Sequence, residues 1–161
     1  MTNHSYKDLV VWQRSMELVL ELYKLTDCFP KSEIYCLAPQ IRRSAISMPA
    51  NITEGRRRNG KKDFSIFLTT AYSSGAELET LIKISKQLPF SQNLDFSSAC
   101  DLLSQSMKML NSMISKLKAN EAKKLTKVIP IMYNYIDTDA VLSELPANRS
   151  RKRSNLSELR L

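Results

Sequence analysis

Apolar residues recur three and four positions apart along the first 118 residues of the chain, which predicts amphipathic α-helices rather than strands. Prolines and an Asn-Gly pair interrupt this pattern, so it divides into four long stretches. With only 3 Gly and 6 Pro among 161 residues, the chain has little material for the many turns of a strand-rich fold. The predicted helices span residues 7–27, 33–58, 61–88 and 98–118, the last with an alternative start at Asp95.

Capping signals precede the first and the last of these helices. Ser5 and Asp8 have the spacing of a capping box, in which a hydroxyl and a carboxylate satisfy free backbone N–H groups. Ser98 and Asp101 repeat this spacing before the fourth helix. Both helices are therefore expected to begin close to these pairs.

Two rows of apolar residues follow the first predicted helix. A helix with two such rows either lies deep in a bundle or uses the second row to meet another subunit. Trp12, in the first row, is predicted to be a packing residue with its indole N–H satisfied locally, and not a ligand site. The first row is Leu9, Trp12, Met16, Val19 and Tyr23, and the second is Val11, Leu18, Leu22 and Leu25.

Two prolines fall inside the second predicted helix. Pro39 lies in its first turns, where a proline costs little. Pro49 is predicted to kink the helix near Ala45 or to divide it there, with Ser47 capping the restarted segment.

Small residues gather in the middle of the third predicted helix, from Thr69 to Ala76. A glycine in mid-helix, here Gly75, costs about 1 kcal/mol unless something packs against it. Close approach of a neighbouring helix is therefore favoured over a ligand cavity.

These elements predict an all-α fold, an antiparallel up-and-down four-helix bundle formed by residues 5–119. Residues 120–161 are predicted to be a basic and largely disordered tail, because their apolar pattern is weak. Within this tail the apolar segment 128–133 is interrupted by Pro130, and residues 148–153 (NRSRKR) form a basic cluster.

The charge of the chain narrows the choice of partner. Its net charge is +8 and its pI is about 9.5, which favours an anionic partner such as nucleic acid. The positive charge is concentrated between Gln40 and Asp63, where Glu54 is the carboxylate inside the run. The predicted nucleic-acid-binding residues are Arg42, Arg43, Arg56, Arg57, Arg58, Lys61 and Lys62.

A purely structural role for this basic stretch stays open. Its arginines could form a solvated helix face or pair with carboxylates, as Glu54 and Arg58 are spaced to do. This alternative applies most strongly to Arg42 and Arg43. Neighbouring residues diverge by about 100° around a helix, so one of the two could easily pair internally. No aromatic residue is interleaved with the charges, so phosphate contacts are predicted and base stacking is not.

The sequence contains few of the residues that catalysis or metal binding requires. His4 is the only histidine, the three cysteines form no CxxC pair, and no glycine-rich phosphate loop is present. Glu77 and Glu79 are two positions apart on a helix and cannot face each other. We therefore expect no enzyme, no metal and no cofactor. Without a signal peptide or an apolar run of membrane-spanning length, a cytoplasmic protein with no membrane partner is expected.

Four segments of the chain together resemble a known family. The sequence is similar to the four-helix-bundle proteins of the 23S rRNA intervening-sequence family, also called an S23 ribosomal protein family, over about the first 118 residues. It departs from the family at Arg56-Arg57-Arg58, where an aromatic and a small residue are usual, and in the length of its tail. The segments are YKDLVVWQ (6–13), Phe29-Pro30, QIRRSAISMPANITEG (40–55), whose RRSAISMPANITEG part is specific, and AELET (76–80).

The resemblance implies a ring-shaped homo-oligomer, most often a pentamer, with a basic surface proposed to bind RNA or DNA. It also implies kinship with accessory proteins that work alongside a reverse transcriptase. Residues and resemblance together predict a non-catalytic homo-oligomer that binds nucleic acid with low sequence preference. The alternative is an oligomeric protein-interaction scaffold, or an accessory subunit of a reverse-transcriptase-type enzyme. A membrane-surface protein would need an exposed apolar helix face, which only residues 128–136 offer.

Overall fold

A computed structural model describes the backbone of residues 5–58 and 60–135 and the side chains of 5–58, 60–124 and 126. Within these ranges the chain is helical throughout its regular elements, and no strand is found. Short 3₁₀ turns precede α1, α2 and α4, at Tyr6–Asp8, Lys31–Glu33 and Pro89–Ser91. The α-helices are α1 (Val10–Asp27), α2 (Leu37–Arg57), α3 (Lys61–Gln87) and α4 (Ser97–Tyr135).

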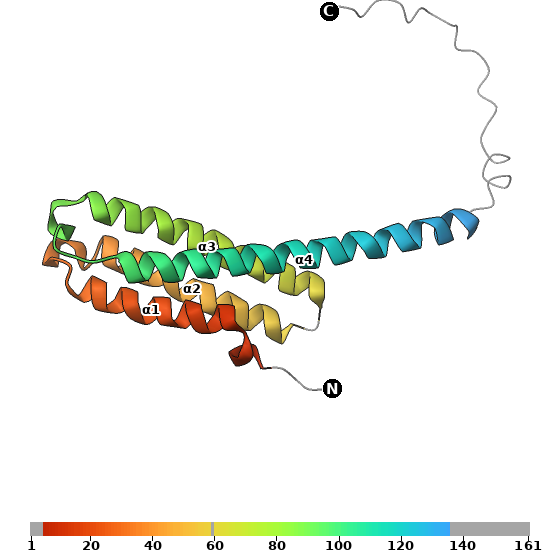
Figure 1. Cartoon of the computed structure of the whole chain (residues 1–161), viewed down its shortest axis with the longest axis horizontal. Coiled ribbons are helices and arrows are strands. Elements are labelled where there is room, and N and C mark those ends of the chain that lie inside the picture. Colours follow the sequence, from red (N-terminus) through yellow and green to blue (C-terminus); the bar gives the residue numbers. More distant parts are fainter. Residues whose placement is uncertain (1–4, 59, 136–161) are drawn as a thin grey trace, which may run out of the picture. The chain divides into compact units, whose positions relative to one another are not determined.

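The helices alternate in direction, so that each short connection joins neighbours (Figure 1). The first compact unit of the chain ends at Ala122 and contains α1, α2, α3 and the N-terminal part of α4; a second begins at Lys123. Within the first unit the fold is the predicted all-α up-and-down four-helix bundle. Within the described residues, no helix is both long and apolar enough to cross a membrane.

The core of the bundle confirms the helical pattern of the sequence. On α2, Ile41, Ala45, Met48 and Ile52 recur at helical spacing and are completely buried. On α3 the buried apolar residues are Leu68, Ala71, Leu78 and Ile82, and on α4 Ala99, Leu103, Ser106 and Leu110 are buried. Each helix thus contributes one apolar stripe to a common core, which is the main source of stability in such a fold.

The two apolar rows of α1 are buried to different depths. The second row, Val11, Leu18, Leu22 and Leu25, is buried in the bundle, so it is not available to meet another subunit. In the first row Val19 is buried as well, but Trp12 is half-buried and Tyr23 is 37% exposed, so these two residues lie at the margin of the core. Of the two alternatives, deep burial or contact with another subunit, the structure therefore shows deep burial for the second row.

Helix α2 continues through Pro49 without a break. Of the two predicted outcomes, a kink or a division near Ala45, the division is wrong: Pro49 is buried inside a continuous helix, and its packing helps to hold the helix together. Ser47 does not cap a restarted segment. Its hydroxyl lies 2.9 Å from that of Ser74 on α3, and Asn51 Nδ2 donates to Ser47 O at 2.8 Å.

Two of the predicted helix starts and one end also need correction. The Ser5–Asp8 capping box is present, but it closes the 3₁₀ turn, and α1 begins only at Val10. Helix α2 begins at Leu37 rather than Glu33, after a separate 3₁₀ turn. Helix α4 extends to Tyr135 and not to Lys118, because Ala, Glu, Lys and Leu favour a helix even where the apolar pattern fades. Residues 136–161, with the basic cluster 148–153, lie outside the described part.

Helix α4 begins at Ser97, between the two predicted starts at Asp95 and Ser98. Asp95 accepts hydrogen bonds from the backbone N–H of Ser97 at 2.9 Å and from the Ser97 hydroxyl. These bonds, the hydroxyl first, and the charge of Lys86 lower the pKa of Asp95 against a smaller opposing effect of desolvation. A carboxylate with a lowered pKa stabilises the folded state above its ordinary pKa, and this contribution is lost as the pH falls through the folded-state pKa.

Two glycines mark close helix contacts. Gly75 of α3 is buried against Met48 of α2 and Met107 of α4, which supports close approach over a ligand cavity at the small residues. At Gly55, a Cβ atom would lie 2.6 Å from Phe67 Cβ and 3.0 Å from Phe64 Cδ2 on α3. The C-terminal end of α2 therefore touches α3 at a point that has no room for a methyl group.

We expect Gly55→Ala to destabilise the protein by about 1–3 kcal/mol, because the new methyl would press on Phe67 Cβ, which cannot move without the α3 backbone. Gly75→Ala is the matched control. Its nearest obstacle is the flexible thioether of Met107, and alanine is about 1 kcal/mol better in a helix, so stability should change by less than about 1 kcal/mol. Urea unfolding followed by circular dichroism measures both, and equal losses would contradict this account.

A second pair of variants concerns buried hydroxyls. Ser106 Oγ is buried in α4 without a hydrogen-bond partner among the described residues, whereas the equally buried Ser15 donates to Val11 O at 2.7 Å. Removing an unsatisfied polar group is favourable, so Ser106→Ala should stabilise the protein by about 1 kcal/mol. Ser15→Ala should not stabilise it, and a gain of the same size in both variants would count against the assignment.

Candidate nucleic-acid interface

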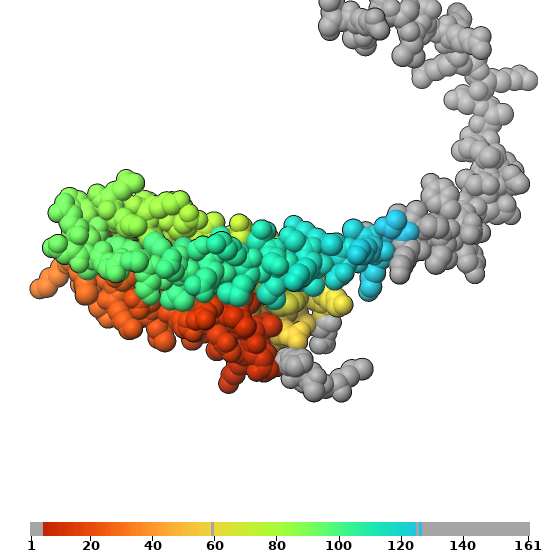
Figure 2. Space-filling view, viewed as in Figure 1, coloured from red at the N-terminus to blue at the C-terminus, as the bar shows by residue number. Residues whose placement is uncertain are grey.

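Five of the predicted binding residues meet where α2 passes into α3. We call this set the junction cluster: Arg56, Arg57, Arg58, Lys61 and Lys62, all of them exposed. The arginines come from the end of α2 and the lysines from the first turn of α3, and the Gly55–Phe67 contact holds the two helices together behind them. The N-terminal residues of α1 lie at the same end of the bundle (Figure 2).

Arg57 lies over the ring of Tyr6, with its Cζ 5.6 Å from the ring centroid. Tyr6 in turn makes an edge-to-face contact with Trp12, at 5.3 Å between centroids. The indole N–H of Trp12 donates to Thr53 Oγ1 at 3.0 Å, one turn before Arg57 on α2. Trp12 is thus a packing residue, as predicted, but its partner lies on another helix. A chain of contacts from α1 to α2 therefore supports the Arg57 guanidinium.

Arg58 has two contacts of its own. Its Nη2 lies 2.6 Å from Glu54 Oε1, so the predicted ion pair forms, and both side chains are about half exposed. Its Cζ lies 5.7 Å from the ring centroid of Phe67 on α3. An exposed pair of this kind contributes at most about 0.5 kcal/mol, so a stronger anion could replace Glu54.

A hollow of about 120 Å³ lies between the arginines and the lysines. Its lining combines three cationic side chains, two glycines and one aromatic ring. Because Gly60 offers no side-chain cap to α3, the positive end of the α3 dipole adds to the charge here. The lining residues are Gly55, Arg56, Arg58, Gly60, Lys61 and Phe64.

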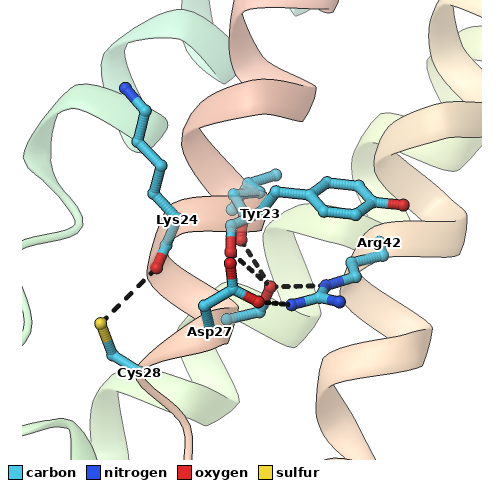
Figure 3. A network of polar contacts seen from close by, with 7 residues as sticks. Tyr23, Lys24, Asp27, Cys28 and Arg42 are labelled. Atoms are coloured by element: carbon cyan, nitrogen blue, oxygen red, sulfur yellow. Dashed lines mark hydrogen bonds and ion pairs between the residues drawn. The ribbon is translucent and has the colours of Figure 1, made fainter.

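Arg42 lies in a different environment, against the end of α1 (Figure 3). Its Nη2 is 2.7 Å from Asp27 Oδ1, and its Nε donates to Thr26 Oγ1 at 2.7 Å. Its Cζ also lies 4.5 Å from the ring centroid of Tyr23. Three contacts from the C-terminal end of α1, at the negative end of its dipole, thus hold Arg42 in place. This is the structural alternative that the sequence left open.

Arg43 is exposed, and it lies about 21 Å before Arg57 along α2, at a rise of 1.5 Å per residue. The seven predicted residues therefore do not form one patch. The structure brings the junction cluster together at one end of the bundle and leaves Arg42 and Arg43 toward the other.

A second hollow, a groove of about 380 Å³, lies between α3 and α4. Ile82, Leu103 and Met107 are among its apolar lining residues, and Lys83 and Lys108 lie at its edges. Lys83 is paired with Glu79 at 2.7 Å. Within the described residues, no group of three His, Cys, Asp or Glu side chains could hold a metal ion.

Residues 7–112 match the sequence profile of the 23S rRNA-intervening sequence protein family. The chain belongs to this family. It is also similar to the crystal structure of a protein of unknown function from the S23 ribosomal protein family of Bacteroides thetaiotaomicron. The TM-score is 0.60 at 24% identity, over 65% of this chain and 98% of that chain, so the likeness shows a shared fold. No functionally curated protein is significantly similar to this chain.

For this member of the 23S rRNA-intervening sequence family, sequence reasoning missed the aromatic residues of the interface. Tyr6 lies 51 positions before Arg57, and Phe67 lies in the next helix after Arg58. No local pattern links either ring to an arginine. The only signal was the small residue at Gly55, which allows α3 to come close.

The two neighbouring arginines of α2 should behave differently when they are changed. We expect Arg42→Ala to lower the free energy of unfolding by about 1–2 kcal/mol, since it removes two charge-assisted hydrogen bonds and leaves Asp27 without its partner. Arg43→Ala, the matched control, should change it by less than about 0.5 kcal/mol. Urea unfolding measures both values, and an Arg42 variant as stable as the control would show that the Arg42 contacts contribute little.

Proposed function

We propose that this protein is a non-catalytic, cytoplasmic homo-oligomer that binds nucleic acid through phosphate contacts of the junction cluster. The observation that carries the proposal is the accumulation of five exposed cations at one helix junction, where Arg56, Arg58 and Lys61 line a common hollow. Arginine and lysine are the usual phosphate ligands, and such contacts read no sequence.

The placement of the two lysines supports a functional role. Lys61 and Lys62 lie in the first turn of α3, next to the positive end of the helix dipole, and Asp63 is the acidic residue of that turn. A cation at a helix N-terminus costs about 0.3–1 kcal/mol where an anion would gain as much. Residues that lower stability in this way are typical of binding sites, because a bound phosphate would offset the repulsion.

Self-assembly would strengthen this binding. Several copies of the junction cluster in one oligomer act on the same polyanion, and their modest affinities combine through multivalency. The exposed apolar residues of the bundle favour contact with further copies. Leu20 of α1 is 60% exposed, and Ile34 and Tyr35 in the α1–α2 connection are 46% and 90% exposed.

The same residues favour a second candidate function. Ile34 and Tyr35 lie at the end of the bundle opposite the junction cluster, where they suit a protein partner better than a nucleic acid. The alternative is therefore a protein-interaction scaffold, such as an accessory subunit of a reverse-transcriptase-type enzyme. Mixing the protein with random-sequence RNA and DNA separates the two functions, since a scaffold alone would bind neither.

The salt dependence of binding tests the phosphate contacts. We expect the change of Arg56, Arg57 and Arg58 to alanine to reduce the slope of log K against log salt by about 2, because each phosphate contact with a single strand contributes about 0.7. Fluorescence anisotropy with labelled random-sequence RNA and DNA between low and physiological salt gives this slope.

Three lysines at the other end of the bundle provide a control of equal charge. Lys24, Lys31 and Lys86 are exposed near the ends of α1 and α3 and in the α1–α2 connection. Their triple alanine variant has the same net charge as the arginine variant, so a loss of general attraction would affect both. A slope that falls equally in the two variants would falsify the assignment to the junction cluster.

A further inference from the structure

Arg57 and Arg58 are neighbours in sequence, yet each guanidinium lies over an aromatic ring. Arg57 lies over Tyr6 from the 3₁₀ turn before α1, and Arg58 lies over Phe67 of α3. Adjacent residues of a helix diverge by about 100°, so one ring could not serve both. The fold instead supplies a separate ring from a different element for each arginine.

The two contacts restrict how the guanidinium groups can turn. Both Cζ atoms lie within the distance of about 6 Å at which a cation is attracted to a ring face. Both rings are only half-exposed, whereas both arginines are exposed. Each guanidinium is thus supported on its inner side and accessible to solvent.

The ion pair of Arg58 holds one edge of its guanidinium in the unbound protein. Glu54 takes up that edge, through Nε at 2.9 Å and Nη2 at 2.6 Å. A guanidinium has five N–H donors, so the edge-on carboxylate leaves the other N–H groups available to a phosphate, and it does not cover the flat faces of the group. Both N–H donors and a planar π-surface therefore remain for recognition.

We propose that this end of the bundle prefers single-stranded over double-stranded nucleic acid, because unpaired bases stack on the guanidinium faces of Arg57 and Arg58. Unpaired bases stack on arginine planes and on aromatic rings, while a duplex keeps the faces of its bases covered. The N–H groups of the junction cluster, those of Arg57 and Arg58 included, then contact the phosphates of the same strand. This inference rests on the proposed function and adds the class of nucleic acid to it.

Lysine variants separate stacking from charge. Arg57→Lys together with Arg58→Lys keeps both positive charges but removes both planar faces. Arg43→Lys is the matched control, since it is the same exchange on the same helix about 21 Å away from Arg57. Circular dichroism checks that all three proteins have the same helix content.

The experiment compares an unstructured 12-nucleotide strand, as RNA and as DNA, with a duplex of the same sequence, by competition in fluorescence anisotropy. We expect the parent protein and the Arg43→Lys variant to bind the single strand about 10-fold more tightly than the duplex, a typical effect of one stacked base. In the double lysine variant the preference should disappear while the salt slope for the single strand stays the same. A 2-aminopurine base in the strand should change its fluorescence on binding to the parent protein and less with the variant.

The outcomes distinguish the two proposals. If neither strand form binds, the proposed function fails and the inference fails with it. If both forms bind with a steep salt slope but equally well, or if the double lysine variant keeps the preference, then the phosphate contacts stand and base stacking is overturned. A tighter complex with the duplex would also overturn it.

Discussion

The contact between Gly55 and Phe67 is the constraint on which the candidate interface depends. A methyl group at position 55 would lie 2.6 Å from Phe67 Cβ, so only glycine lets the end of α2 rest on α3 at this point. Because the helices meet there, the arginines that end α2 lie beside the lysines that begin α3, and Arg56, Arg58 and Lys61 line a common hollow. The same contact places the Phe67 ring beside Arg58, which turns a packing residue into part of the site.

The basic residues of α2 have opposite roles at the two ends of the bundle. Arg42 joins α2 to α1 through Asp27 and Thr26, so its charge is used for internal structure. The arginines of the junction cluster lie in and just after the last turn of α2, where Arg58 is paired with Glu54 and both side chains are about half exposed. Which cations stay accessible to a partner therefore depends on burial and ion pairing, and not on the number of positive charges along the helix.

The junction cluster combines charged residues whose positions are each unfavourable for stability. Two lysines lie at the positive end of α3, and three consecutive arginines repel one another across a few ångströms. The buried stripes of the bundle, with Ile41, Met48, Ile52 and Leu68 completely enclosed, provide the stability that tolerates this repulsion. A rigid frame with a strained, charged end is a common arrangement for binding sites, because the ligand relieves the strain.

The sequence by itself determined the helices, their core faces and the family, because the spacing of apolar residues and the RRSAISMPANITEG block are local properties of the chain. It did not determine whether Pro49 would break α2, which row of α1 lies deepest, or where α4 ends, since packing and backbone propensity outweighed the local signals there. Only the tertiary structure decided that Arg42 is paired and that Tyr6 and Phe67 support the arginines of the junction cluster. The reason is physical: periodicity reports which way a side chain points from its own helix, whereas its partners come from other helices and are chosen when the bundle packs.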